Sequence, residues 1–370
     1  MATYYVRTTG DDNNAGSDAA PWETLEHAAG AISSGDTVKI GDGTYTIASK
    51  VTIPQATINT TWESESADKT KVTVESAGSQ VFELFKTSST DKTTFKHLTV
   101  KQTSSSGTTY CFYGAQSGTG GIYMANVHIQ DCDIHSKEYA IRYLGPHSKI
   151  ERCRFTRTAG GSAGAIYALR LQQGGVEIDS CLFDGWYDTA IYLEATGMNV
   201  VIRNCTILGH ATSQDDDWGI RTPTGASIYN TIVYSYDAAK LDYGIQFNSA
   251  DATNTIKNCI VFGAYNNGEY NGTGAPTVSA QLEGQTEVTA DGNPVFVDLA
   301  GGDYQPDTSG LAYQRGDNSS YPSKDLNGNS FNDPPSIGCY EAESSGGGGG
   351  GGAVVSSKAG FLSSPFTLNP

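Results

Sequence analysis

The chain has 370 residues, a formal net charge of −17 and 38% hydrophobic residues, with 44 glycines and 21 tyrosines. A nucleic-acid-binding surface needs clustered lysines and arginines, but the 23 in this chain are scattered, so we expect no nucleic-acid partner. No run approaches the roughly 18 consecutive apolar residues of a membrane-spanning helix. Residues 1–7 have neither a basic end nor an apolar core, so the sequence as given predicts no secretory signal.

The N-terminal residues predict a strand, a short helix and a return to strand. Residues 4–6 are apolar or aromatic and precede a polar turn rich in Gly, Asp and Asn. Residues 21–32 predict a helix, because Pro21 suits a first turn and apolar residues then recur every three or four positions up to Ile32. Residues 35–45 alternate again as strands. We expect the helix to cover the open end of the repetitive region that follows.

One short pattern recurs seven times between Thr94 and Val261. It is an aliphatic or aromatic residue, two spacers, a small and usually sulfur-containing residue, one spacer, and a second aliphatic or aromatic residue. The copies are Phe95-Leu98-Val100, Ile129-Cys132-Ile134, Ile150-Cys153-Phe155, Ile178-Cys181-Phe183, Ile202-Cys205-Ile207, Ile228-Thr231-Val233 and Ile256-Cys259-Val261. Irregular spacings of 21 to 34 residues exclude a heptad and indicate one supersecondary unit repeated along an axis.

Each unit predicts three short strands with a sharp bend between two of them. Most units also contain an Ala or Gly followed by Ile, at Ala140-Ile141, Ala165-Ile166, Ala190-Ile191, Gly219-Ile220 and Gly244-Ile245. The first aliphatic residue and the small residue have opposite parity, so both can point inward only if the chain bends between them. The bend positions are Asp131, Arg152, Ser180, Asn204, Asn230 and Asn258, and Asn tolerates the left-handed conformation that a bend needs.

These features predict an all-β fold, a right-handed parallel β-helix with three strands per coil, a short N-terminal capping helix and an extended C-terminal tail. Leucine-rich repeats are the less favoured alternative, because the units lack the Leu/Asn consensus and any helical run. The five cysteines of the repeat should stack in the bore as unpaired apolar residues. The predicted segments are 1–45 for the cap, 46–300 for the β-helix, 301–343 for a closing segment, 344–352 for a Ser/Gly linker and 353–370 for an apolar docking peptide.

Both ends of the chain resemble a known family. The N-terminal motifs are Tyr4-Tyr5-Val6, Gly10-Asp11-Asp12, Pro21-Trp22, Thr24-Leu25, Gly35-Asp36-Thr37-Val38 and Gly43-Thr44-Tyr45. The C-terminal motifs are Asp303-Tyr304, Gly310-Leu311-Ala312, Arg315-Gly316, Asp325-Leu326-Asn327-Gly328 and Ile337-Gly338-Cys339-Tyr340-Glu341. Together they resemble the pectate-lyase-like family of right-handed parallel β-helix proteins. This resemblance implies the fold but not an activity, because the fold carries polysaccharide lyases, glycoside hydrolases, esterases, phage tailspikes and adhesins alike.

The outward side chains of the third strand suggest a carbohydrate platform. If the Ile of each Ala/Gly-Ile pair points inward, the next residue points outward, which places Arg142, Tyr167, Tyr192, Arg221 and Gln246 in one column. Aromatic rings cover the apolar faces of sugars while arginines and amides bond to hydroxyls or carboxylates. Trp186 and Trp218 would extend the platform. The alternative is an aromatic ladder that only covers the strand surface.

Catalytic residues are not identified by the sequence. Hydrolysis of a glycosidic bond needs two carboxylates, for which Asp188, Glu194 and Asp217 are weak candidates, although the run that contains Asp217 also fits a solvated loop tip. No base or cation typical of a lyase stands out. Asp325-x-Asn327-x-Asn329 resembles half of a calcium loop, but its glycine is at the wrong offset and no glutamate follows at the twelfth position. We therefore expect no metal or cofactor and keep calcium as a minor alternative.

The C-terminal residues differ in composition from the rest. Seven glycines at 346–352 form a flexible tether, and residues 353–370 are too apolar for a solvated tail. We expect this segment to dock on a partner through Phe361, Leu362 and Phe366, with a passive end as the alternative. Our first hypothesis is a structural protein of a phage virion, such as a tailspike, a fibre or a capsid-surface protein, located on the virion or outside cells and facing glycans. The second is a secreted polysaccharide lyase or glycoside hydrolase; homo-oligomerisation stays open.

Overall fold

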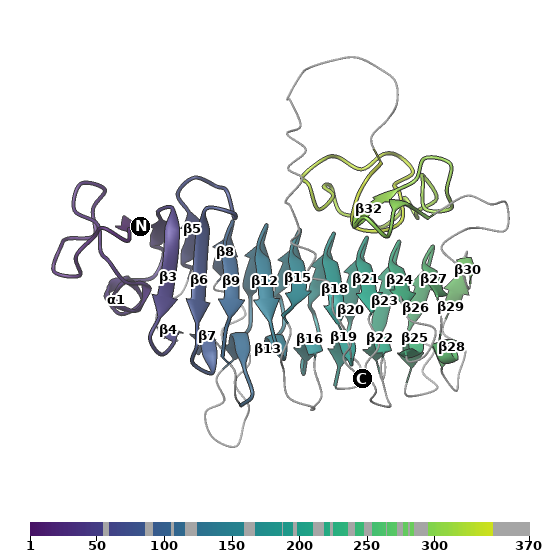
Figure 1. Ribbon diagram of the computed structural model, residues 1–370, viewed down its shortest axis with the longest axis horizontal. Helices are drawn as coiled ribbons and strands as arrows, with labels where there is room; N and C mark the ends of the chain where they lie inside the picture. Colours follow the sequence, from purple (N-terminus) through teal and green to yellow (C-terminus); the bar gives the residue numbers. More distant parts are fainter. Residues whose placement is uncertain are drawn as a thin grey trace, which may run out of the picture.

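The structure, a computed structural model, describes residues 1–342 except 55–58, 86–91, 105–106, 115–123, 159–166, 187, 195–197, 210–217, 223–224, 236–240, 248–253, 264, 272–276, 280–281 and 285–294. The described residues form a right-handed parallel β-helix with three strands per coil, as the repeat predicts (Figure 1). No helix in the described part of the chain is long and apolar enough to cross a membrane.

Three parallel sheets, which we name A, B and C in the order that each coil visits them, run the length of the described solenoid. Sheet A contains β1 (Thr3–Val6), β2 (Thr37–Ile40), β5 (Thr61–Ser64), β8 (Thr93–Lys96), β11 (Val127–Gln130), β14 (Lys149–Glu151), β17 (Glu177–Asp179), β20 (Val200–Arg203), β23 (Ala226–Tyr229), β26 (Thr255–Lys257) and β29 (Thr277–Ser279). Sheet B contains β3 (Gly43–Ile47), β6 (Val72–Ser76), β9 (Thr99–Gln102), β12 (Asp133–Ser136), β15 (Arg154–Arg157), β18 (Leu182–Trp186), β21 (Thr206–Gly209), β24 (Ile232–Ser235), β27 (Ile260–Gly263) and β30 (Leu282–Gly284). Sheet C contains β4 (Val51–Ile53), β7 (Gln80–Leu84), β10 (Tyr110–Gly114), β13 (Tyr139–Leu144), β16 (Tyr167–Leu171), β19 (Thr189–Leu193), β22 (Trp218–Thr222), β25 (Leu241–Phe247) and β28 (Tyr265–Asn271).

The N-terminal helix α1 (Leu25–Ala31) covers the end of the solenoid, as predicted, but it begins later than the sequence indicated. Trp22 is not helical, because it forms a parallel bridge with Val6 in β1. The Asp12 carboxylate accepts hydrogen bonds from the backbone of Thr24, and the Thr24 side chain then caps the helix by accepting from the His27 amide. The helix therefore starts where the cap lies and not at the proline.

The bend between sheets A and B has the predicted left-handed backbone. Its positions and φ angles are Asp131 (51°), Arg152 (52°), Ser180 (52°), Asn204 (48°), Asn230 (49°) and Asn258 (52°), and His97 (57°) occupies the same place one coil earlier. The bend lets the residues on both sides of it point into the bore. The side chain of Asn230 donates to the Asn204 carboxamide oxygen at 3.2 Å, so these amides connect successive coils as well.

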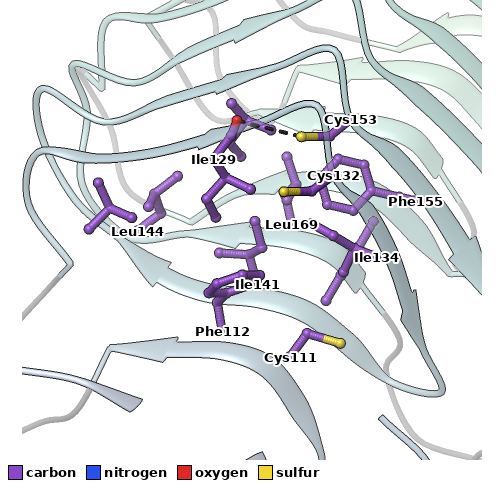
Figure 2. Packing of buried hydrophobic residues seen from close by; sticks show 14 of the residues in the cluster. Cys111, Phe112, Ile129, Cys132, Ile134, Ile141, Leu144, Cys153, Phe155 and Leu169 are labelled. Atoms are coloured by element: carbon purple, nitrogen blue, oxygen red, sulfur yellow. Dashed lines mark hydrogen bonds between the residues drawn. The ribbon is translucent and has the colours of Figure 1, made fainter. Parts of the chain in front are cut away.

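The bore is filled by aliphatic, aromatic and cysteine side chains (Figure 2). The repeat cysteines Cys132, Cys153, Cys181, Cys205 and Cys259 are fully buried and unpaired, which confirms the prediction. Each thiol donates a weak hydrogen bond to a carbonyl in the preceding coil, such as Cys153 to Ile129 at 3.5 Å (Figure 2). Burial raises the pKa of Cys259 to about 12, so its thiol stays protonated and inert.

The closing segment folds back along the outside of sheet B and does not extend the stack (Figure 1). It begins with the antiparallel strands β31 (Phe296–Asp298) and β32 (Asp303–Pro306). Apolar residues that point outward from β18, β21, β24 and β27 pack against it, namely Leu182, Leu208, Ile232, Ile260 and Phe262. Bend side chains hold its backbone: Asn204 donates to the Ser336 carbonyl at 2.9 Å, and Asn230 donates to the Asp317 carbonyl at 3.1 Å.

Candidate functional site

A row of large polar and aromatic side chains lies on the outer face of sheet C, one from each of six successive coils. We call this row the Tyr/Arg ladder; its members are Tyr113, Arg142, Arg170, Tyr192, Arg221 and Gln246. All of them are partly exposed. Neighbouring members belong to hydrogen-bonded parallel strands and are therefore about 4.8 Å apart along the axis. The ladder is a continuous surface that crosses the coils.

The structure places Arg170 in the ladder where the sequence predicted Tyr167. Ile141 pairs with Leu169 in the next coil, so Ala168-Leu169 is the inward pair of that unit. The predicted pair included Ile166, which lies outside the described residues. Sequence reasoning accepted only Ile at this position, and allowing Leu would have identified Arg170.

Tyr167 instead belongs to a second row of side chains on sheet C, next to the ladder. We call this second row the aromatic column. Its members are Tyr110, Tyr139, Tyr167 and Trp218, with Thr189 between the last two. Ring centroids are 5.2 Å apart for Tyr110 and Tyr139 and 5.6 Å apart for Tyr139 and Tyr167. Burial raises the pKa of Tyr167 to about 12, so its phenol is neutral and is no general base at ordinary pH. The column forms an apolar floor beside the ladder.

The ladder arginines lie against these aromatic rings. The guanidinium carbon of Arg142 is 4.4 Å from the ring centroid of Tyr143 and 5.2 Å from that of Tyr139, and its Nη1 donates to the Tyr110 hydroxyl at 2.6 Å. The guanidinium carbon of Arg221 is 4.2 Å from the Trp218 ring centroid. These cation–π contacts hold the arginines flat on the sheet without neutralising their charge.

Glu194, a weak catalytic candidate, is committed to an ion pair. Arg170 donates from Nη2 to Glu194 Oε1 at 2.7 Å and from Nε to Oε2 at 3.0 Å, and Gln172 Nε2 donates to the same Oε2 at 2.5 Å. Burial alone would raise the pKa of Glu194, but the hydrogen bonds from Arg170 and Gln172 hold it below its ordinary value. A carboxylate in this state is a poor general acid.

Asp188, the second described catalytic candidate, does not form a pair with Glu194. Asp188 precedes β19 and Glu194 follows it, so their six-residue separation along an extended strand is about 20 Å. Glycosidases place their two carboxylates roughly 5 to 9.5 Å apart, so Asp188 and Glu194 are not such a pair. Asp217 lies outside the described residues, and so does the whole predicted docking peptide with Phe361, Leu362 and Phe366.

Of the two tryptophans expected to extend the platform, the structure describes the side chain of Trp218 but not that of Trp186. Trp218 is buried, with 6% of its surface exposed, and is part of the aromatic column and not of a flanking loop. Trp186 ends β18 in sheet B, and its side chain is outside the described part of the structure. Trp218 therefore supports the platform from below.

In the calcium-like run of residues 325–329, the Asp325 carboxylate accepts hydrogen bonds from nearby backbone amides. The Asp325 carboxylate accepts from the amides of Asn329 and Glu341, at 2.6 and 3.1 Å, and from the Asn329 side chain at 3.3 Å. Asp325 is fully buried. These donors use the oxygens that a calcium ion would need, and no cluster of three or more His, Cys, Asp or Glu with metal-site geometry occurs among the described residues.

A separate cleft of about 550 Å³ lies beside the bend, where the closing segment meets the early coils. Its lining includes Lys69, His97, Asp131, Arg152 and Leu326. Arg152 donates to both oxygens of Asp131, at 2.8 and 3.0 Å, and His97 Nε2 lies 3.5 Å from Asp131 Oδ2. Lys69 pairs with Asp133 at 2.7 Å, so the cations Lys69 and Arg152 of the lining are both in ion pairs, and we assign this cleft a structural role.

The fold defines the class of protein. The chain belongs to the family described as "Right handed beta helix region", whose family model matches residues 84–282, more than half of the chain. This match confirms the resemblance inferred from the end motifs. No curated protein sequence matches the chain.

Solved structures share the fold at low sequence identity. Pectate lyase Pel9A is 14% identical with a TM-score of 0.60, over 92% of this chain and 96% of that one. A rhamnogalacturonan lyase is 14% identical with a TM-score of 0.46, over 81% and 91% of the two chains. ORF18 of Geobacillus virus E2 is 14% identical with a TM-score of 0.38, over 76% and 60%. Such likeness shows the fold alone.

Proposed function

We propose that this protein binds a glycan along the Tyr/Arg ladder. The observation that supports this most directly is the ladder itself, in which aromatic, cationic and amide side chains follow one another on consecutive coils. Tyr192 offers a ring for the apolar face of a sugar, while Arg142, Arg221 and Gln246 offer donors for hydroxyl or carboxylate groups. An elongated ligand parallel to the solenoid axis would contact several of these residues at once.

Unsatisfied polar atoms on the same face support this proposal. Among the described residues, Arg142 Nε, Arg221 Nε, Trp218 Nε1 and Gln246 Oε1 are buried atoms without a hydrogen-bond partner. Such atoms are costly and uncommon in folded proteins. A ligand rich in hydroxyl groups would supply partners for them after small side-chain rotations.

We further propose that the solenoid is displayed as a structural protein of a phage virion, on the particle and outside cells. The support is compositional: a glycine tether at 346–352 joins the β-helix to residues 353–370, which contain Phe361, Leu362 and Phe366. Large apolar side chains on a short tethered segment gain roughly 1.5 to 3 kcal/mol each when they are buried, so the segment favours a groove on a partner protein. The partner would be another virion or surface protein.

Binding is tested by replacing Tyr192 with alanine and screening a glycan array. Tyr192→Ala should weaken glycan binding about tenfold or more, because large aromatic contacts dominate binding energy. Its melting temperature should change by only a few degrees, since the ring is partly exposed. Tyr229→Ala, which removes a partly exposed tyrosine from the outer face of sheet A, is the matched control and should bind normally. Unchanged binding by Tyr192→Ala would remove the ladder as the binding surface.

The enzymatic hypothesis is tested on the same glycans. Reducing ends would reveal a hydrolase, and absorbance of unsaturated uronates would reveal a lyase. We expect neither signal, because the two carboxylates beside the described ladder are already in ion pairs, Glu83 with Lys50 and Glu194 with Arg170.

Attachment is tested by truncation at Ser345. The truncated protein should remain a folded β-helix, because the residues of the described core, from Val6 to Cys339, are all retained. It should fail to assemble onto its particle, whereas the full chain assembles. Normal assembly of the truncated protein would refute the docking role of residues 353–370 and leave glycan binding untouched.

A further inference from the structure

The charges of the Tyr/Arg ladder are unevenly distributed, and this bears on the kind of glycan that it accepts. Three of its members are arginines, in two neighbouring coils and a third coil further along. Arg170 is bound by Glu194. Within the described residues, no carboxylate lies within ion-pair distance of Arg142 or Arg221. Among the described residues, Arg142 and Arg221 are therefore the ladder arginines without an ion-pair partner.

The distance between these two cations follows from the register. Arg142 pairs with Arg170, Arg170 with Tyr192, and Tyr192 with Arg221, so the two are separated by three coil steps. At about 4.8 Å per step this is about 14 Å. Uncharged or neutralised side chains occupy the interval.

Tyr192 makes the interval suitable for an uncharged sugar. Its ring stacks on that of Tyr167, with centroids 5.1 Å apart and planes 25° apart. The guanidinium carbons of Arg170 and Arg221 lie 5.8 and 5.2 Å from its centroid. The Tyr192 ring thus lies between two guanidinium groups, of which that of Arg170 is paired with Glu194.

Glu194 makes the same interval unsuitable for an acidic sugar. Its pKa is held below the ordinary value, so it is negatively charged at neutral pH, and its side chain is 29% exposed. A ligand carboxylate beside Arg170 would meet this charge. The net charge of −17 adds a general repulsion toward densely charged polyanions.

We infer that the ladder selects a glycan whose acidic sugars are separated by uncharged sugars, and that it discriminates against polymers with a carboxylate on every sugar. This inference rests on the proposed glycan binding and specifies its ligand. Arg142 and Arg221 bind the acidic groups, Tyr192 stacks on an uncharged sugar in the interval between them, and the Glu194–Arg170 pair excludes a further acid.

The test measures binding of the full chain to four polysaccharides by biolayer interferometry at moderate ionic strength. Hyaluronan carries a carboxylate on every second sugar and gellan on every fourth, polygalacturonate carries one on every sugar, and dextran carries none. We expect the better of hyaluronan and gellan to bind at least about tenfold more tightly than polygalacturonate and dextran, which corresponds to about 1.4 kcal/mol.

Three variants and one control test which residues determine this selectivity. Arg142→Gln and Arg221→Gln should each weaken binding of the preferred polymer, hyaluronan or gellan, about tenfold and should reduce the salt dependence of that binding. Glu194→Gln should increase polygalacturonate affinity about tenfold, because it removes the repelling charge and releases Arg170. Lys101→Gln removes a 44% exposed cation from the outer face of sheet B and should leave all four affinities unchanged. Melting temperatures verify that each variant is folded.

Three results separate failure of this inference from failure of the proposed function. If hyaluronan, gellan, polygalacturonate and dextran bind equally well through Tyr192, glycan binding stands and the selectivity is overturned. The selectivity is also overturned if Glu194→Gln leaves polygalacturonate binding unchanged. If no polymer binds here and the glycan array is also negative, both proposals are overturned.

Discussion

Replacing Asn230 by alanine should detach part of the closing segment from the solenoid. Asn230 is fully buried, with a φ angle of 49°. Its side-chain nitrogen donates to Asn204 at 3.2 Å and to the Asp317 carbonyl at 3.1 Å, and its oxygen accepts from the Asp317 amide at 2.6 Å. Alanine would leave all of these partners unsatisfied and would also occupy a left-handed conformation.

The magnitude follows from these contacts. Each lost hydrogen bond costs about 1 kcal/mol, and a left-handed alanine costs about 1 kcal/mol more, so we expect a destabilisation of about 4 kcal/mol. Asn199→Ala is the matched control, because Asn199 is exposed and has the same φ of 49°. It should cost only the backbone contribution of about 1 kcal/mol.

Hydrogen exchange followed by mass spectrometry distinguishes a local effect from a global one. In Asn230→Ala, amides of residues 312–339 should exchange faster, because the segment opens locally, while strands of sheet A in the early coils keep their protection. Chemical denaturation gives the overall loss of stability. A loss below about 1 kcal/mol with unchanged exchange of residues 312–339 would refute the idea that Asn230 anchors the closing segment.

Two further predictions concern the bore and the bend. Cys181→Ser should lower stability by about 1 to 3 kcal/mol, because the fully buried thiol is replaced by a more polar hydroxyl; an unchanged melting temperature would contradict this. Burial alone would raise the pKa of Asp131, but hydrogen bonds from His97 and Arg152 lower it below the ordinary 3.8, so its contribution is complete above pH 3.8 and is lost as the pH falls below that value. The difference in melting temperature between the wild type and Asp131→Asn should therefore shrink between about pH 6 and about pH 2, and a constant difference would disprove it.

The repeat alone was sufficient to predict the fold, because each coil obeys local rules. The parity change between Ile129 and Cys132 requires a bend, and the left-handed Asp131 between them provides it. The cysteine positions follow from the same parity, and their burial is therefore predictable without knowledge of distant contacts.

The composition of the ladder depended on the tertiary structure. The connections between sheets B and C vary in length, so sequence spacing does not say which residue follows the inward position; hydrogen bonding to the next coil decides it. That register put Arg170 where Tyr167 was expected, and it brought Glu194 from the following coil onto Arg170. Both results come from contacts between residues more than 20 positions apart.

The path of the closing segment was also decided only in three dimensions. Outward apolar residues such as Leu182, Ile232 and Phe262 look like ordinary strand residues in the sequence. They form an apolar surface once sheet B brings them onto one face, and the closing segment buries this surface. Hydrogen bonds from Asn204 and Asn230 then fix where the segment lies. The local pattern thus determines each coil, whereas the pairing between coils determines which surface the protein presents.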